Sequence, residues 1–129
     1  MNAVRTVARP MMGAIFVIAG LDVLANPEPR VKIVSSFVER IAELVPAAPR
    51  DPTTAVTMNA LVHLAGGAML AVGLFPRLAA LSLAGSMVPT TLGAHRFWEF
   101  TDPAQRSMQR THFLKNAAIL GGLLITALD

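Results

Sequence analysis

The polar residues best suited to bind a small molecule lie at the ends of otherwise apolar segments of this chain. Asn59 and His63 are four residues apart, so a helix would place them on one line. A neutral imidazole donates one hydrogen bond and accepts another, and an amide does both as well. Polar or aromatic residues near the ends of the other apolar segments complete the set. The predicted ligand-binding residues are Asp22, Asn59, His63, His95, Trp98, Lys115 and Asn116.

Each of these residues also has a purely structural interpretation. A lone His63 on an apolar helix face commonly forms a hydrogen bond to a neighbouring helix, and Asp22 with Lys115 could close a helix bundle as an ion pair. His95 and Trp98 fit the belt of amphipathic rings found at lipid headgroup level. The sequence leaves these alternatives open.

Composition identifies the environment in which this chemistry would take place. The 129 residues suffice for one domain, 1–129, and are 53% hydrophobic and 15% charged, whereas soluble domains carry about 25% charged residues. Mean hydropathy is +0.54, which favours a bilayer. The net charge of +3 comes without a Lys/Arg run, so we expect no nucleic-acid partner. There is no cysteine, and no two histidines have helical i,i+4 spacing, so we expect no intrinsic cofactor and no metal site.

Four segments are long and apolar enough to cross a bilayer, which takes about 20 residues of helix. The sequence therefore predicts an all-α fold, a polytopic membrane protein built as a four-transmembrane-helix bundle. The predicted spans are residues 6–25, 54–76, 78–95 and 111–128.

Residues 30–45, between the first and second spans, have a different pattern. Ile33, Phe37 and Ile41 fall on one helical face, while Lys32 and Glu39 fall on the other. The segment is too polar to span, so we expect an amphipathic helix that caps the bundle or lies on the membrane.

Connectivity brings the candidate residues to one end of the bundle. The end of the first span, the start of the second, the end of the third and the start of the fourth all lie on the same side of the membrane. All seven predicted ligand-binding residues are near those ends. We therefore expect them to surround one polar opening, with the amphipathic helix above it.

Three stretches resemble the DoxX family of small four-helix prokaryotic membrane proteins. The most specific is GGAMLAVGLFPRLAA at Gly66–Ala80, within the longer similarity at His63–Trp98. The family often has a basic residue shortly after the first motif, where this chain has Asp22. The other two stretches are RPMMGAIFVIAGLDVL at Arg9–Leu24 and FLKNAAILGGLLI at Phe113–Ile125.

The resemblance implies a multi-pass protein of the prokaryotic plasma membrane. The family is named after a subunit of a thiosulfate:quinone oxidoreductase, and a relative belongs to a membrane-associated oxidoreductase complex. It thus implies a membrane subunit of a redox-linked complex that interacts with a quinone. His63 or His95 would then bind a quinone carbonyl, and Trp98 or Phe97 would stack on the ring. The alternative is a non-catalytic anchor or accessory subunit that docks a larger protein. Membrane lipids and a further copy of the chain are the other expected partners.

Overall fold

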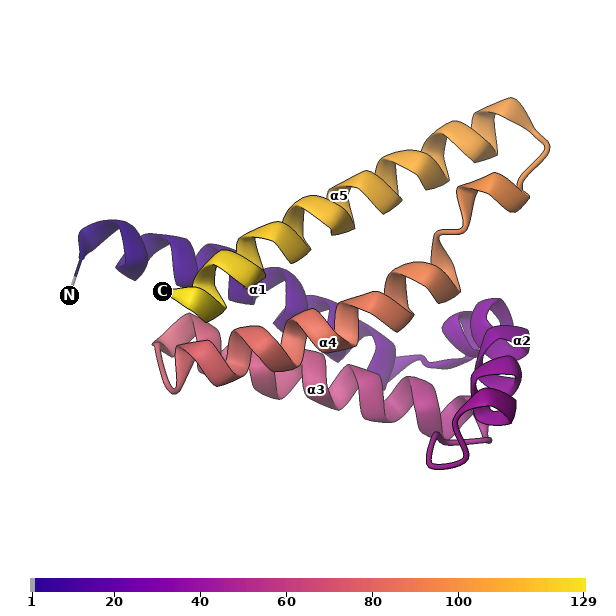
Figure 1. Ribbon diagram of the computed structural model, residues 1–129, viewed down its shortest axis with the longest axis horizontal. Helices are drawn as coiled ribbons and strands as arrows, with labels where there is room; N and C mark the ends of the chain where they lie inside the picture. The colour runs from indigo at the N-terminus through magenta and orange to yellow at the C-terminus, as the bar shows by residue number, and fades with distance from the viewer. Residues whose placement is uncertain (1) are drawn as a thin grey trace.

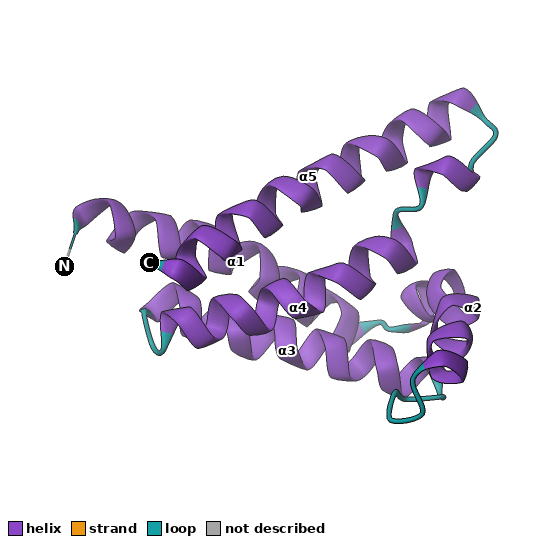
Figure 2. Cartoon of the chain, viewed as in Figure 1, coloured by secondary structure: helices purple, strands orange, loops and turns teal. Residues whose placement is uncertain are grey.

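The structure, a computed structural model, describes residues 2–129 and is helical throughout that range apart from short connections (Figure 2). The expected all-α class is therefore confirmed. Its elements are α1 (Ala3–Ala25), α2 (Glu28–Leu44), α3 (Pro52–Val72), α4 (Pro76–Ala94), the 3₁₀ helix η1 (Phe97–Glu99) and α5 (Pro103–Leu128).

Two helices begin at a capping aspartate followed by proline. The carboxylate of Asp51 accepts a hydrogen bond from the backbone N–H of Thr54 at 3.1 Å, and that of Asp102 accepts one from Gln105 at 3.1 Å. Each cap satisfies a backbone donor that the first helical turn leaves free. α5 consequently starts at Pro103, two turns before the predicted span at 111–128.

The four long helices run along the length of the molecule, and α2 crosses one end of them (Figure 1). α1 packs against α3, α3 against α4, and α4 against α5, while α2 contacts both α3 and α4. The chain termini and the α3–α4 turn lie at the opposite end. The end of α1, the start of α3 and the end of α4 therefore lie at the end covered by α2, while α5 begins farther from the other helices (Figure 1).

The turn between α3 and α4 depends on left-handed backbone conformations. Gly73 ends α3 at φ 77°, and Leu74 donates its N–H to the carbonyl of Met69 at 2.8 Å. Glycine is favoured there because it has no Cβ to clash with the backbone. Three residues, ending at Phe75, thus suffice to reverse the chain.

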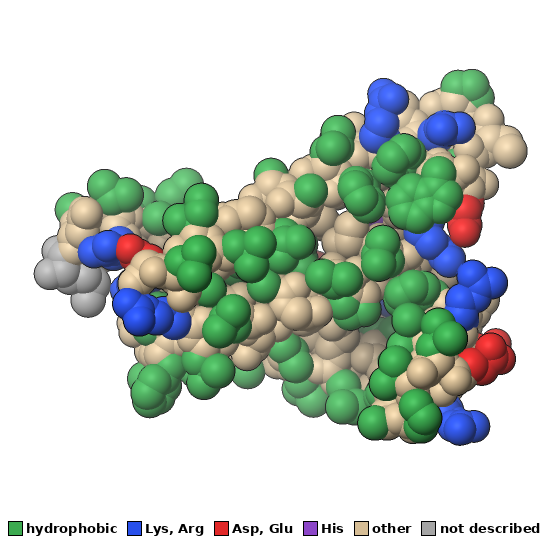
Figure 3. All heavy atoms as spheres, in the orientation of Figure 1, with side chains coloured by type: hydrophobic (Ala, Val, Ile, Leu, Met, Phe, Trp, Pro, Cys, Tyr) green, Lys and Arg blue, Asp and Glu red, His purple; other side chains and the backbone are tan. Residues whose placement is uncertain are grey.

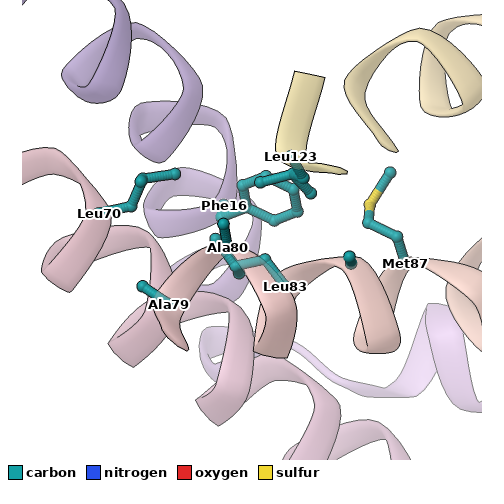
Figure 4. Close-up of a cluster of buried hydrophobic side chains, with 8 residues drawn as sticks. Phe16, Leu70, Ala79, Ala80, Leu83, Met87 and Leu123 are labelled. Atoms are coloured by element: carbon teal, nitrogen blue, oxygen red, sulfur yellow. The ribbon is translucent and has the colours of Figure 1, made fainter. Parts of the chain in front are cut away.

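α1 and α3 approach closely through glycine. A Cβ on Gly67 would lie 2.8 Å from the carbonyl oxygen of Gly13 and 2.9 Å from Cβ of Phe16, so any larger residue would force the helices apart. Phe16 then inserts into the main apolar cluster beside Leu123 of α5 and Leu83 of α4 (Figure 4). These contacts hold α1, α4 and α5 together below the polar end.

Within residues 2–129, three helices, α1, α3 and α5, are long and apolar enough to cross a membrane. α4, which corresponds to the predicted span at residues 78–95, is not among them, because Arg77 and several hydroxyl side chains reduce its mean hydropathy. Hydrophobic side chains cover the middle of the visible face, and charged ones gather toward its two ends (Figure 3). This distribution matches a bilayer around the middle of the bundle.

Candidate functional site

A cavity of about 650 Å³ lies at the end of the bundle that α2 covers. All five α-helices contribute to its wall. Of the seven predicted ligand-binding residues, the structure brings five to this wall: Asn59, His63, His95, Lys115 and Asn116.

His63 is the buried histidine of the cavity. It is 7% exposed, and its ring meets Phe16 edge to face with 5.2 Å between ring centroids. Its Nε2 atom is buried and has no hydrogen-bond partner in the described part of the chain. The interhelical hydrogen bond, which was the structural alternative for this residue, is therefore not formed through Nε2.

The space left by the glycines that follow His63 is filled by neighbouring helices. A Cβ on Gly66 would lie 3.0 Å from Cγ of Leu83 in α4, and Gly67 faces α1. These two glycines bring helices together and do not line the cavity.

Asn59 joins α3 to α4 through a chain of hydrogen bonds. Ser86 Oγ donates to its Oδ1 at 2.6 Å, and its Nδ2 donates to Thr90 Oγ1 at 2.7 Å. Thr90 in turn donates to the backbone carbonyl of Ser86 at 2.8 Å. Because its amide is already bonded on both sides, Asn59 acts as a fixed part of the wall.

Asn116 makes the corresponding link between α5 and α4, donating from Nδ2 to Thr91 Oγ1 at 3.1 Å. The threonines of α4 that receive these bonds were not among the predicted site residues. Hydroxyl residues in an otherwise apolar helix were the signal that could have identified them, since such groups require partners in a bilayer.

His95 lies at the end of α4, beside α5. Its Nδ1 is 2.7 Å from Oε1 of Gln109, and its ring stacks on His112 with 5.1 Å between centroids. It is therefore positioned by protein contacts, in contrast to His63.

Asp22 and Trp98 are not among the residues that line the cavity. Trp98 packs edge to face on Phe97 and Phe113 and is 48% exposed, a position that fits the interfacial alternative. Asp22 is exposed, and the ion pairs found within residues 2–129 do not include one between Asp22 and Lys115. The interpretation of that pair as a closing salt bridge is therefore wrong.

The cavity wall is basic. Lys115 of α5 and Arg30 of α2 both line it, and no carboxylate does so in the part of the chain described. Arg30 belongs to the segment predicted as an amphipathic helix and was not among the predicted site residues. Arg30 reaches the cavity wall because its helix, α2, folds over the opening of the cavity. No group of three or more His, Cys, Asp and Glu residues in 2–129 could hold a metal ion.

α2 covers the cavity through apolar contacts. Gly93 of α4 allows its close approach, since a Cβ there would lie 3.1 Å from Cδ1 of Phe37 and 3.3 Å from Cγ1 of Val34. The guanidinium of Arg96 lies 5.6 Å above the ring of Phe37, a cation–π contact that fastens α2 to the η1 region. α2 thus packs directly against α4 and the η1 region.

The volume lies within the roughly 300–1,000 Å³ typical of small-molecule pockets. Its walls are mostly apolar, with one buried, unpaired imidazole and two cations. Such a site suits a flat apolar molecule that carries hydrogen-bond acceptors or a partial negative charge.

The DoxX family model matches residues 4–96, from α1 through α4. No curated protein and no solved structure matches the chain.

Proposed function

The chain belongs to the DoxX family, a family of small integral membrane proteins, and on that premise we propose that it binds a quinone as the membrane subunit of a redox-linked complex. In this proposal it is a multi-pass protein of the prokaryotic plasma membrane. The cavity beneath α2 is the quinone site, and His63 is its principal hydrogen-bonding residue.

The observation that carries the proposal is the buried ring of His63 in the cavity wall. Leaving a buried polar atom unpaired costs about 1–3 kcal/mol, and Nε2 of this ring has no partner within residues 2–129. A quinone carbonyl would accept a hydrogen bond from the neutral ring and remove that penalty. A purely structural histidine would have gained stability from a protein partner instead.

The remaining wall residues fit the same ligand. Phe16 and Phe37 offer aromatic surface to a ring, in place of Trp98 and Phe97. The positive charges of Lys115 and Arg30 would stabilise the anionic reduced form of the quinone, or an oxyanion that binds beside the quinone in the cavity. A bound quinone would supply a two-electron carrier, and a partner oxidoreductase would supply the electrons.

A four-span arrangement is supported by the way α4 is packed. Its apolar face is buried against the other helices at Ala80, Leu83 and Met87. The hydroxyl groups of Ser86, Thr90 and Thr91 are bonded to Asn59 or Asn116, so these three are satisfied inside the bundle rather than exposed to lipid. A helix of lower hydropathy can cross a bilayer under these conditions.

Native mass spectrometry of the protein extracted gently from its own membranes tests the proposal. We expect a quinone mass on the wild type, its loss in His63→Leu, and its retention in His112→Leu. His112 is the matched control because it is a histidine of the same end that does not line the cavity. Because leucine removes the unpaired nitrogen, His63→Leu should unfold no more readily than the wild type. Equal quinone occupancy in the two variants would refute the assignment.

The outer face of α2 favours a second candidate, an anchor or accessory subunit that docks a larger protein. Ile33 is 53% exposed and Leu44 74% exposed, beside exposed charges of both signs at Lys32, Glu39 and Arg40. The same spectra separate the two functions. A stoichiometric protein partner without a quinone, retained in His63→Leu and lost in Arg40→Glu, would establish the anchor.

A further inference from the structure

A second apolar groove, of about 350 Å³, lies between α1 and α5. It is lined by Met11, Met12, Ile15, Ala118, Ile119 and Gly122. Ile15 and Ile119 also line the cavity that contains His63. The groove and the cavity therefore adjoin each other at this pair of isoleucines.

The groove exists because α1 and α5 are held together mainly at one end. There Arg5 pairs with Asp129, and Thr126 Oγ1 lies 3.8 Å from Sδ of Met12. Elsewhere α1 packs on α3 and α5 on α4, and α5 diverges from the other helices toward its start (Figure 1). Ala118 has only a methyl side chain and Gly122 has none, so the space between the two helices stays open.

Polarity changes in one direction along α5. Lys115 and Asn116 face the cavity, whereas Ala118, Ile119 and Gly122 in the groove are wholly apolar. From Lys115 to Gly122 the helix advances about 10 Å, at about 1.5 Å per residue. The polar end lies beside α2 and the apolar end toward the middle of the bundle, which is the orientation of a lipid-like molecule in a bilayer.

We propose that this groove holds the apolar tail of the molecule whose head binds at His63, so that the ligand is an isoprenoid-tailed quinone that enters from the lipid between α1 and α5. This inference rests on the proposed function and specifies its ligand class and route. The shared wall at Ile15 and Ile119 supports one continuous occupant rather than two separate ones. A tailless quinone would leave the groove to lipid.

The position of the tail is the property to measure, because a tail gains little free energy when it exchanges lipid for an apolar groove. The probe is a benzoquinone whose short isoprenoid tail carries a diazirine, added to the protein in phosphatidylcholine nanodiscs. After illumination, labelled peptides are identified by mass spectrometry. We expect label on peptides that contain Met11, Met12 or Ala118.

Neighbouring residues of α5 provide matched variants. Gly122→Leu should reduce the label by about fivefold or more, since a Cβ there already lies 3.4 Å from Cε of Met12 and the rest of the side chain fills the groove. Gly121→Leu should leave it unchanged, because a Cβ at Gly121 meets nothing within 4 Å. Ala118→Leu and Ala117→Leu form a second pair, with Ala118 in the groove and Ala117 outside it. Thermal unfolding of all four variants shows which of them fold, and labelling is compared within a pair whose two members both fold.

The outcomes separate this inference from the function on which it rests. Label confined to α3 and α4, or equal label in the Gly122 and Gly121 variants, overturns the tail groove while the head site stands. A photoreactive phosphatidylcholine that labels the groove as strongly as the quinone probe shows annular lipid there and also overturns it. Label that excess untagged quinone does not suppress, or that persists in His63→Leu, overturns the quinone site itself.

Discussion

The close contact of α1 with α3 at Gly67 yields the most direct prediction for stability. In Gly67→Ala the new methyl group would lie 2.8 Å from the carbonyl oxygen of Gly13, 2.9 Å from Cβ of Phe16 and 3.0 Å from the backbone nitrogen of Val17. Two of these are backbone atoms, which cannot turn aside as a flexible side chain can. α1 would have to move away from α3.

The size of the effect follows from two opposing terms. Overpacking of this kind costs about 1–3 kcal/mol, whereas Gly→Ala inside a helix gains about 0.5–1 kcal/mol. The control is Gly121→Ala, at a helical position where the methyl group meets nothing within 4 Å. Helix propensity cancels between the two variants. The difference in their free energies of unfolding should therefore be about 1–3 kcal/mol.

Unfolding of both variants by a denaturing detergent, followed by circular dichroism, measures this difference. Gly67→Ala should unfold at a lower detergent fraction than the wild type, and Gly121→Ala at an equal or higher one. Equal stability of the two alanine variants would mean that α1 and α3 are not in backbone contact. The packing described for the bundle would then be incorrect.

Three further predictions concern other parts of the chain. Asn59→Leu breaks the hydrogen bonds from α3 to α4 and should lower the free energy of unfolding by about 0.6–1.7 kcal/mol; an unchanged value in detergent titration would contradict the network. The hydrogen bond from Arg5 lowers the pKa of Asp129. The stabilisation that this contact gives the fold is therefore fully present above the ordinary carboxyl pKa of about 4. It is lost as the pH falls through the lowered pKa. Wild type should thus lose more thermal stability than Asp129→Asn between neutral pH and about pH 3, and parallel losses would oppose this. Trp98, the chain's one tryptophan, should be quenched more by lipids brominated near the headgroup than near the chain end; the reverse order would place it deeper.

Much of the helical layout could be predicted from hydropathy and connectivity. The predicted segment at residues 30–45 became α2 at Glu28–Leu44, and the span at 54–76 became α3 at Pro52–Val72. The predicted start of α5, residue 111, is later than the observed Pro103 because the first two turns of this helix are polar. Asp102 and Pro103 signal that start by capping, which is independent of hydropathy.

The structure brings five of the seven predicted site residues to one cavity wall, and leaves Asp22 and Trp98 outside it. Connectivity determines which end of the bundle a residue reaches, and it placed Asn59 and His63 beside Lys115. It does not determine the rotation of a helix about its own axis. A residue can therefore reach the expected end of the bundle and still point away from the cavity wall, as Asp22 and Trp98 do. Arg30 escaped attention because the path of α2 over the opening depends on tertiary packing.

In the proposed function, His63 is the residue that holds the quinone head. Equilibrium titration of the purified protein in nanodiscs with a short-chain benzoquinone, for wild type, His63→Leu and His112→Leu, tests this directly. We predict that His63→Leu weakens binding by about tenfold or more, as expected for loss of a buried hydrogen bond, while His112→Leu binds as the wild type does. Equal dissociation constants for all three proteins would contradict the proposed site.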